Sequence, residues 1–276
     1  MTGTLYIVAT PIGNLGDISK RTAQTLSDVD FIASEDTRVT LKLLSHLNIK
    51  KQLISYHEHN RRESGEKIIN RLLAGENCAL VTDAGTPCVS DPGEELVHLC
   101  LESGILVVSI PGPCAAVTAL TLSGLAIGRF TFEGFLPITK KSRFERLGEL
   151  KTEKRTMIFY EAPHKLIRTL NDMLTVFGDR RLSISRELTK IYEETLRCTI
   201  SEAITHFEQI PPRGEFVLVL EGTQNERESE IDFTQATVIV KTYVDGGSSI
   251  KDAVKKAAEE TGLPKNALYK AALNNE

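Results

Sequence analysis

The feature that most constrains the fold is an alternation of short apolar runs with helix-compatible segments from the start of the chain to Ile110. We predict strands at Leu5–Ala9, Phe31–Ala33, Cys78–Thr82 and Ile105–Ile110, and helices at Ile18–Leu26, Thr40–Leu47, Gly65–Leu73 and Glu94–Glu102. Strands that alternate with helices favour a mainly parallel sheet with helices packed on its faces. The first part of the chain is therefore predicted to be an α/β domain.

A Pro-Gly-Pro sequence at Pro111–Pro113 is the best candidate for a domain boundary, because it follows a strand and breaks regular structure. Beyond it we predict a helix at Ala115–Leu122 and strands at Thr156–Tyr160 and Glu215–Leu220, which indicate a second α/β unit. The predicted organisation is an N-terminal α/β domain at 1–112, a C-terminal α/β domain at 113–224, and a linker with a helical tail at 225–276.

The tail begins after a polar stretch, Gly222–Asp232, that has almost no apolar anchor and is predicted to be a linker. Ser249 and Asp252 fit a capping box, and Gly262–Pro264 ends one helix and starts another. We predict two helices joined by a tight turn. They could be a helix-turn-helix that contacts nucleic acid, or a structural cap.

Composition indicates a soluble globular protein, since 41% of the 276 residues are apolar and 25% are charged. The first ten residues lack the basic start and apolar core of a secretory signal, and no apolar run is long enough to span a membrane. The five cysteines form no CxxC pair, and their odd number favours reduced thiols. We therefore expect a cytoplasmic protein with no membrane partner.

Positive charge is concentrated in one part of the chain, although the net charge is −4. Ile138–Arg197 holds 14 Lys and Arg against 9 Asp and Glu, an excess of five, whereas the remainder carries a net −9. This segment could be a face that meets phosphate groups, or an ordinary solvated surface. The overall charge argues against a protein that coats nucleic acid without selectivity.

Three loops rich in glycine and proline follow predicted strands, and they indicate a ligand site. They are ATPIGN at Ala9–Asn14, TDAGTPCVSDPG at Thr82–Gly93 and PGPCAA at Pro111–Ala116. Ligands of open α/β sheets bind at the carboxyl ends of strands, where these loops should meet. The chain contains neither GxGxxG nor GxxxxGK[ST], which argues against the usual dinucleotide and Walker A sites.

The same loops carry a family resemblance, together with four further blocks: SEDTR at Ser34–Arg38, YHEHN at Tyr56–Asn60, IFYEAPHKL at Ile158–Leu166 and RELTKIYEE at Arg186–Glu194. In this order they resemble the ribosomal RNA small subunit methyltransferase I family of the tetrapyrrole methylase superfamily. The resemblance runs from about Leu5 to Glu221, and the tail resembles the family's helical extension more weakly.

The resemblance implies two α/β domains with S-adenosylmethionine (SAM) bound in the cleft between them, and usually a homodimer. It also implies methylation of the ribose 2′-oxygen of a cytidine in the decoding region of 16S rRNA, on the assembled small ribosomal subunit. By matching motifs, the SAM-binding residues should be Pro11, Asp83, Ala84, Gly85, Thr86, Val89, Cys114, Ala115, Tyr160, Glu161, Ala162 and Leu188.

A ribose hydroxyl is a poor nucleophile at neutral pH, so a carboxylate or imidazole within hydrogen-bond reach could accept its proton. We place Glu35 and Asp36 first, because the pair follows a short strand and precedes Arg38. Other candidates are His57, His59 and Glu133. The alternative for Asp36 is a helix cap that pairs with Arg38.

Basic and imidazole side chains in the matching blocks and the basic segment are candidates for RNA contact: Arg38, His57, His59, Arg143, Arg146, Lys165, Arg186 and Lys190. Each could instead be a solvated surface residue. We predict no metal site, because His57 and His59 have no third ligand at a suitable spacing.

Two other functions compete with rRNA methylation. One is a methyltransferase of the same superfamily that acts on a small molecule, such as a tetrapyrrole, or on a protein side chain. The other is a non-catalytic ribosome-binding factor. The basic segment and the tail argue against the first, and the intact loops argue against the second.

Overall fold

A computed structural model describes residues 2–223, 233–261 and 263–273. The chain divides into two compact units, one that ends at Gly222 and one that begins at Thr223. The first unit contains two five-stranded sheets, and the second consists of helices. Most of the predicted linker, residues 224–232, lies outside the described residues.

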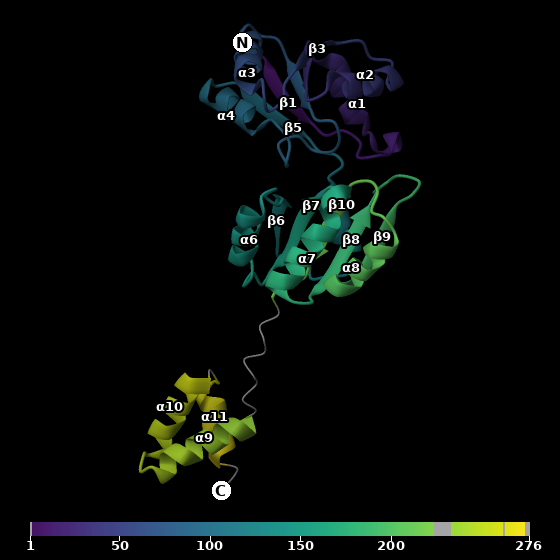
Figure 1. Ribbon diagram of the computed structural model, residues 1–276. Coiled ribbons are helices and arrows are strands. Elements are labelled where there is room, and N and C mark those ends of the chain that lie inside the picture. Colours follow the sequence, from purple (N-terminus) through teal and green to yellow (C-terminus); the bar gives the residue numbers. More distant parts are fainter. Residues whose placement is uncertain (1, 224–232, 262, 274–276) are drawn as a thin grey trace. The chain divides into compact units, whose positions relative to one another are not determined.

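The first sheet is entirely parallel, in the order β3-β2-β4-β1-β5 (Figure 1). Its strands are β1 (Thr4–Val8), β2 (Phe31–Ser34), β3 (Gln52–Ser55), β4 (Cys78–Val81) and β5 (Leu106–Ile110). The prediction of a parallel α/β sheet is therefore confirmed. Parallel pairing brings the carboxyl ends of all five strands to one edge.

Helices cover both faces of this sheet (Figure 1). They are α1 (Lys20–Asp28), α2 (Thr37–His46), α3 (Arg61–Leu73) and α4 (Glu94–Glu102). Alternate residues of β1 point to opposite faces, so Leu5 packs with α3 and α4 whereas Val8 packs with α1 and α2. The two cores hold the sheet rigidly and fix the positions of the loops that leave it.

The second sheet is mixed, in the order β6-β7-β10-β8-β9, with β6 and β7 parallel and the other pairs antiparallel. Its strands are β6 (Phe130–Phe135), β7 (Thr156–Glu161), β8 (Arg181–Arg186), β9 (Glu194–Thr199) and β10 (Phe216–Leu220). Its helices are α5 (Ala115–Leu122), α6 (Lys140–Glu149), α7 (Leu166–Phe177) and α8 (Ile200–Gln209). Helices α6, α7 and α8 share one core with the sheet, and α5 packs in a separate core that includes Ile158, Val217 and Val219.

The C-terminal unit has three helices among its described residues, α9 (Phe233–Asp245), α10 (Ile250–Thr261) and α11 (Lys265–Leu273). The two predicted helices are present as α10 and α11, but the prediction missed α9, whose sequence contains β-branched residues of low helix propensity. Small side chains at Ala236, Ala253 and Ala257 let these helices pack closely. The predicted cap is present, since the Asp252 amide donates to Ser249 Oγ at 3.2 Å.

Candidate functional site

The three glycine- and proline-rich loops meet at the carboxyl edge of the first sheet. Thr10 and Gly85 exchange two backbone hydrogen bonds, of 2.8 and 3.1 Å. Thr86 Oγ1 donates to the carbonyl of Pro113 at 2.9 Å. The backbone of Gly112 passes so close to Ala9 that a Cβ at position 112 would lie 2.8 Å from the Ala9 Cβ. The loops therefore form one connected surface, as the sequence predicts.

Segments of the second sheet close this surface from the other side. A Cβ at Gly13 would lie 2.5 Å from Lys190 Cγ and 3.0 Å from the carbonyl oxygen of Leu188. The Ala116 amide at the start of α5 donates to the Tyr160 hydroxyl at 3.2 Å. The loops of the first domain thus pack directly against the second, and the space between them is enclosed by both.

Two of these loops hold non-glycine residues in the left-handed region of backbone conformation. Cys88 and Ser90 have φ of 71° and 65°, and Glu187 and Thr189 have φ of 50° and 65°. Such conformations cost roughly 1–3 kcal/mol each and tend to occur where a site requires a particular backbone shape. Both strained turns contribute residues to the cavity described next.

The cavity between the domains, which we call the central cleft, has a volume of about 540 Å³. It is lined by Ile12, Glu35, Thr82, Asp83, Ala84, Gly85, Thr86, Val89, Ser90, Asp91, Cys114, Ala115, Phe135, Tyr160, Glu161, Ala162, Pro163, His164, Glu187, Leu188, Lys190, Glu215, Phe216 and Val217. Eleven of the twelve predicted SAM-binding residues are in this lining. The exception is Pro11, which precedes the lining residue Ile12.

Acidic side chains gather on one side of the central cleft. Glu35 Oε2 accepts a hydrogen bond from Thr82 Oγ1 at 2.7 Å, and Asp83 Oδ1 accepts one from the Asp36 amide at 3.1 Å. Burial and the charge of Glu35 raise the pKa of Asp83. Burial, followed by the charge of Glu35, raises the pKa of Asp91 to about 6. This part of the cleft therefore favours a cationic group.

The two predicted catalytic residues have different surroundings. Glu35 lines the central cleft, whereas Asp36 is absent from its lining. Asp36 caps α2 by accepting from the Arg38 amide at 2.8 Å, and its side chain pairs with the Arg38 guanidinium. The hydrogen bonds with Arg38 lower the pKa of Asp36 to about 2. Asp36 thus has the capping arrangement named as its alternative.

A second hollow, which we call the outer groove, adjoins the central cleft and has a volume of about 900 Å³. Its lining residues are Glu35, Tyr56, His57, Glu58, His59, Arg61, Ser90, Asp91, Pro92, Gly93, Glu94, Glu95 and His98. The rings of His57 and His59 lie edge to face with centroids 5.9 Å apart, and His57 Nδ1 is buried without a hydrogen-bond partner. The groove therefore holds both predicted histidines.

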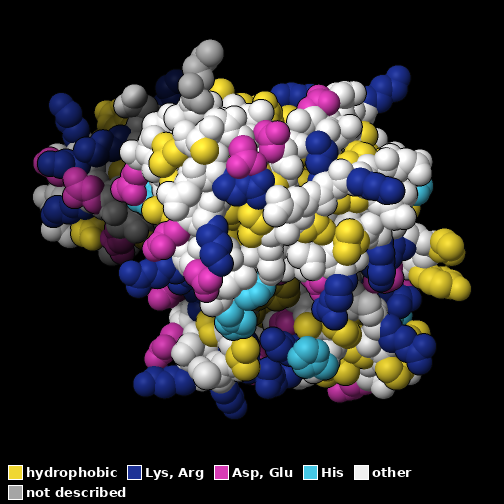
Figure 2. Space-filling view, turned by 90° about the horizontal axis from the view of Figure 1, so that it is seen from above, with side chains coloured by type: hydrophobic (Ala, Val, Ile, Leu, Met, Phe, Trp, Pro, Cys, Tyr) yellow, Lys and Arg dark blue, Asp and Glu magenta, His cyan; other side chains and the backbone are white. Residues whose placement is uncertain are grey.

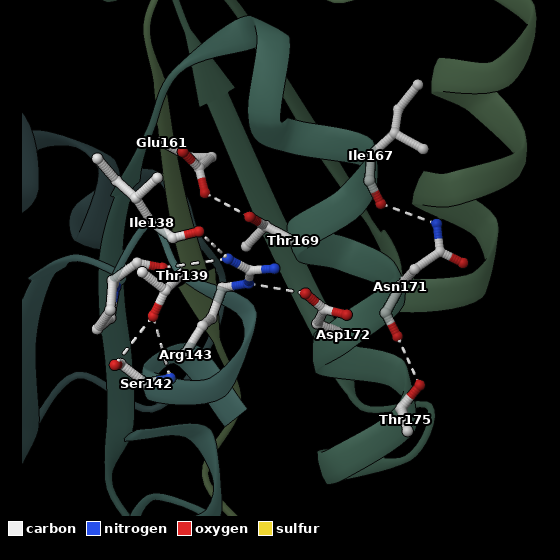
Figure 3. Close-up of polar contacts among 11 residues, drawn as sticks. Ile138, Thr139, Ser142, Arg143, Glu161, Ile167, Thr169, Asn171, Asp172 and Thr175 are labelled. Carbon is white, nitrogen blue, oxygen red and sulfur yellow. Dashed lines mark hydrogen bonds and ion pairs between the residues drawn. The ribbon is translucent and has the colours of Figure 1, made fainter. Parts of the chain in front are cut away.

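The structure contradicts the prediction that Arg143 contacts RNA phosphates. Its side chain is 3% exposed and its Nε donates to Asp172 Oδ2 at 2.7 Å (Figure 3). Its Nη1 donates to the carbonyls of Pro137 and Ile138 at 3.1 and 2.8 Å. Arg143 joins α6 to α7 within the second domain, because these buried acceptors need a donor.

Glu161 is also held inside the fold (Figure 3). Its Oε2 accepts from Thr169 Oγ1 at 2.6 Å, and its Oε1 accepts from the Ala162 amide at 2.8 Å. The residue is 5% exposed. Although Glu161 borders the central cleft, its carboxylate anchors the end of β7 against α7.

The other basic candidates have varied surroundings. Arg38 pairs with Asp36 and is 85% exposed on its side chain, Arg146 pairs with Glu133 and Glu149, and Arg186 pairs with Glu194. Lys190 pairs with Glu187 and lines the central cleft, and Lys165 lies in a short 3-10 helix after β7. On the face drawn in Figure 2, Lys and Arg side chains are spread among acidic ones rather than gathered in one field.

Several lining residues were not singled out from the sequence, among them Asp91, Phe135, Glu187 and Glu215. Asp91 stands in the same loop as the predicted residues Asp83–Val89, so its place in the motif was an available signal. Phe135 ends β6 and Glu215 directly precedes β10 in the second sheet, where no motif marked them. Within the described residues, no group of three or more His, Cys, Asp or Glu is arranged to hold a metal ion. No described helix is both long and apolar enough to cross a bilayer.

Comparison with solved structures defines the class of the fold. A diphthine synthase superposes with a TM-score of 0.61 at 13% identity, over 79% of this chain and 90% of that one. Uroporphyrin-III C-methyltransferase from Thermus thermophilus, complexed with S-adenyl homocysteine, superposes with a TM-score of 0.58 at 17% identity, over 79% and 97% of the two chains. The family model of tetrapyrrole (corrin/porphyrin) methylases matches residues 4–204. The fold is that of these methyltransferases, and the chain belongs to the tetrapyrrole methylase family.

Relatives that match nearly the whole chain identify one family within this class. Ribosomal RNA small subunit methyltransferase I of Halalkalibacterium halodurans is 48% identical over 270 residues, which cover 97% of this chain and 93% of the relative. The protein of the same name from Bacillus subtilis is 48% identical over 273 residues, covering 98% and 94%. A model of the RsmI C-terminal HTH domain matches residues 246–276. The chain belongs to the ribosomal RNA small subunit methyltransferase I family.

Proposed function

We propose that this protein transfers a methyl group from SAM to rRNA of the small ribosomal subunit, at the 2′-oxygen of a cytidine in the decoding region. The observation that carries the proposal is the meeting of three strand-end loops with two loops of the second domain around one cleft, in a chain nearly half identical to relatives of that name. The substrate class comes from those relatives, and the 2′-oxygen and the cytidine come from the motif resemblance.

The central cleft has the size and chemistry that SAM requires. Its volume of about 540 Å³ lies within the range of roughly 300–1,000 Å³ typical of small-ligand pockets. Ala84 and Ala115 bring loop backbone to the wall of the cleft, and Val89 and Leu188 offer apolar contacts. The carboxylates of Glu35, Asp83 and Asp91 complement the positive charge of the sulfonium donor.

The chain's own residues would promote transfer mainly by orientation. Displacement at a methyl carbon needs the incoming oxygen, the carbon and the leaving sulfur in line, and a rigid site supplies this alignment. The Thr10–Gly85 bridge and the strained turns at Ser90 and Thr189 make the walls stiff. The outer groove offers an approach for a nucleotide, where His57 and His59 could stack on a base.

The substrate is proposed to be the assembled small subunit rather than bare RNA. The chain has a net charge of −4, and on the face drawn in Figure 2 the basic side chains lie among acidic ones. A surface of this kind binds bare polyanions weakly and relies on complementary shape. Lys190, His57 and His59 are proposed as RNA contacts at the cleft and groove, with Arg38, Arg146, Lys165 and Arg186 farther out on the surface.

A transfer assay tests the proposal. Purified protein and tritiated SAM are incubated separately with small subunits that lack the modification, with deproteinised 16S rRNA, and with a porphyrinoid precursor. We expect label in rRNA of the subunits, recovered after nuclease digestion as a 2′-O-methylated cytidine. Label in the porphyrinoid alone would refute the proposal, and failure to bind SAM in calorimetry would instead support a non-catalytic ribosome-binding factor.

We also propose that the protein acts as a homodimer in the cytoplasm. Ile191 and Tyr192 are 94% and 76% exposed on the turn between β8 and β9, which is unusual for large apolar side chains in a monomer. All five cysteines are free, as suits a reducing compartment. Light scattering after size exclusion should give twice the chain mass, and a monomer at micromolar concentration would contradict the dimer.

A further inference from the structure

The central cleft and the outer groove share three lining residues: Glu35, Ser90 and Asp91. A hydroxyl that enters through the groove and a methyl donor that lies in the cleft would meet beside these residues. A group that accepts the hydroxyl proton must stand at this junction, since proton transfer requires hydrogen-bond reach. The junction offers two carboxylates, Glu35 and Asp91.

The backbone holds Asp91 in place through its neighbours. Ser90 has a φ of 65°, and Gly93 has a φ of 142° that a residue with a side chain rarely adopts. A Cβ at Gly93 would lie 2.5 Å from Cys88 Sγ and 2.7 Å from Leu80 Cδ2, so the turn packs tightly on the end of β4. The strain and packing fix where the Asp91 carboxylate is presented.

Glu35 is already engaged at the same junction. Its Oε2 accepts from Thr82 Oγ1 at 2.7 Å and from the Asp83 amide at 3.5 Å. The Thr82 hydroxyl has one proton and lies within hydrogen-bond reach of both carboxylates, so Glu35 and Asp91 share it as a donor. Glu35 also has the Asp83 amide as a donor, and hydrogen bonds to a carboxylate stabilise its ionised form, so Asp91 is the better proton acceptor of the two.

We propose that Asp91 is the general base of the methyl transfer and that Glu35 is a positioning residue that acts on Asp91 through its charge. This inference rests on the proposed function. The hydroxyl oxygen bonds to the methyl carbon while the carbon–sulfur bond breaks and leaves its electron pair on sulfur. The hydroxyl proton passes to an Asp91 oxygen, and solvent removes it after product release.

The electrostatic surroundings support this role. The groups that face Asp91 are Glu35, Thr82, Asp83 and Cys88 from the first domain and Glu215 and Tyr160 from the second. Burial is the largest cause of the raised pKa of Asp91, about 6, and the three acids add to it. A base with a pKa near the working pH is ionised there and still holds a proton well.

The test compares D91N, E35Q and D28N by single-turnover transfer to small subunits from pH 5 to 9, with SAM affinity measured by calorimetry. D91N should lower the rate constant for transfer by about 10²- to 10⁴-fold at saturating SAM, a larger effect than its loss of SAM affinity, and should lose the acid limb of the pH–rate profile. D28N removes the same charge from an exposed position on α1 that lines neither hollow, and should match the wild type.

The E35Q variant retains Asp91, so its pH–rate profile reports on the pKa of Asp91 without the neighbouring charge. Loss of the neighbouring negative charge lowers the pKa of Asp91, so the acid limb, near pH 6 in the wild type, should move to lower pH. A wild-type rate and acid limb in D91N would overturn the proposal, as would an E35Q variant that loses the limb while D91N keeps it. Wild-type protein that binds SAM but labels no rRNA would instead refute the proposed function.

Discussion

The ion pair between Arg143 and Asp172 gives the sharpest test of the structure of the second domain (Figure 3). Replacement of Arg143 by Met leaves the Asp172 side chain, which is 12% exposed, without its counter-ion. It also removes the donor to the carbonyls of Pro137 and Ile138. Loss of one partner from a buried pair costs roughly 3–5 kcal/mol.

This loss should lower the denaturation midpoint of the unit that ends at Gly222 by on the order of 10 °C, because 1 kcal/mol corresponds to about 2–4 °C in a unit of this size. Lys141→Met is the matched control, since Lys141 lies on the same helix, its side chain is 88% exposed and its partner Glu145 is 62% exposed, and it should cost less than about 1 kcal/mol. Thermal unfolding by circular dichroism measures both. An R143M protein of wild-type stability whose affinity for small subunits falls would refute the structural role and restore Arg143 as an RNA contact.

Three further outcomes follow from the site. Gly112→Ala should weaken SAM binding about 10- to 100-fold in calorimetry, because overpacking against Ala9 costs roughly 1–3 kcal/mol; Gly148→Ala, where a Cβ meets nothing within 4 Å, should leave it unchanged. Lys190→Ala should weaken binding to small subunits and reduce the slope of log affinity against log salt by about 1, and an unchanged slope would exclude a phosphate contact. Because the pKa of Asp91 is raised in the folded state, that state still holds a proton between about pH 4 and 6 that the unfolded state has released, and the free energy of unfolding falls as pH rises through this window. D91N removes this penalty, so it should raise the melting temperature above pH 6 and give no advantage below pH 4.

Much of the first domain, and α5 in the second, could be predicted from the sequence, because apolar strands and helices bounded by glycine or proline carry local signals. The bounds of α4 and α5 match the predicted helices at Glu94–Glu102 and Ala115–Leu122. The strands β8 and β9 were missed because they mix polar and apolar residues, with β9 at the sheet edge. β6 was missed because it is interrupted by a register shift between Phe132 and Gly134.

In the site, too, features set by local sequence were predicted and features set by long-range contacts were not. The glycine- and proline-rich motifs identified most of the cleft lining, since loop chemistry is local. The role of Asp91 depends on Glu35 and Glu215, which lie 56 and 124 positions away in the chain, and only folding brings these charges together. Arg143 was misjudged for a similar reason, because its partner Asp172 lies 29 residues farther along and buries it.

The most direct test of the central claim is a crystal structure of the protein with S-adenosylhomocysteine. The ligand should lie in the central cleft, in contact with the loops at Ala9–Asn14, Thr82–Gly93 and Pro111–Ala116, with its sulfur directed toward the junction at Asp91. Density for the ligand at any other position, or an empty cleft at saturating ligand, would contradict the account.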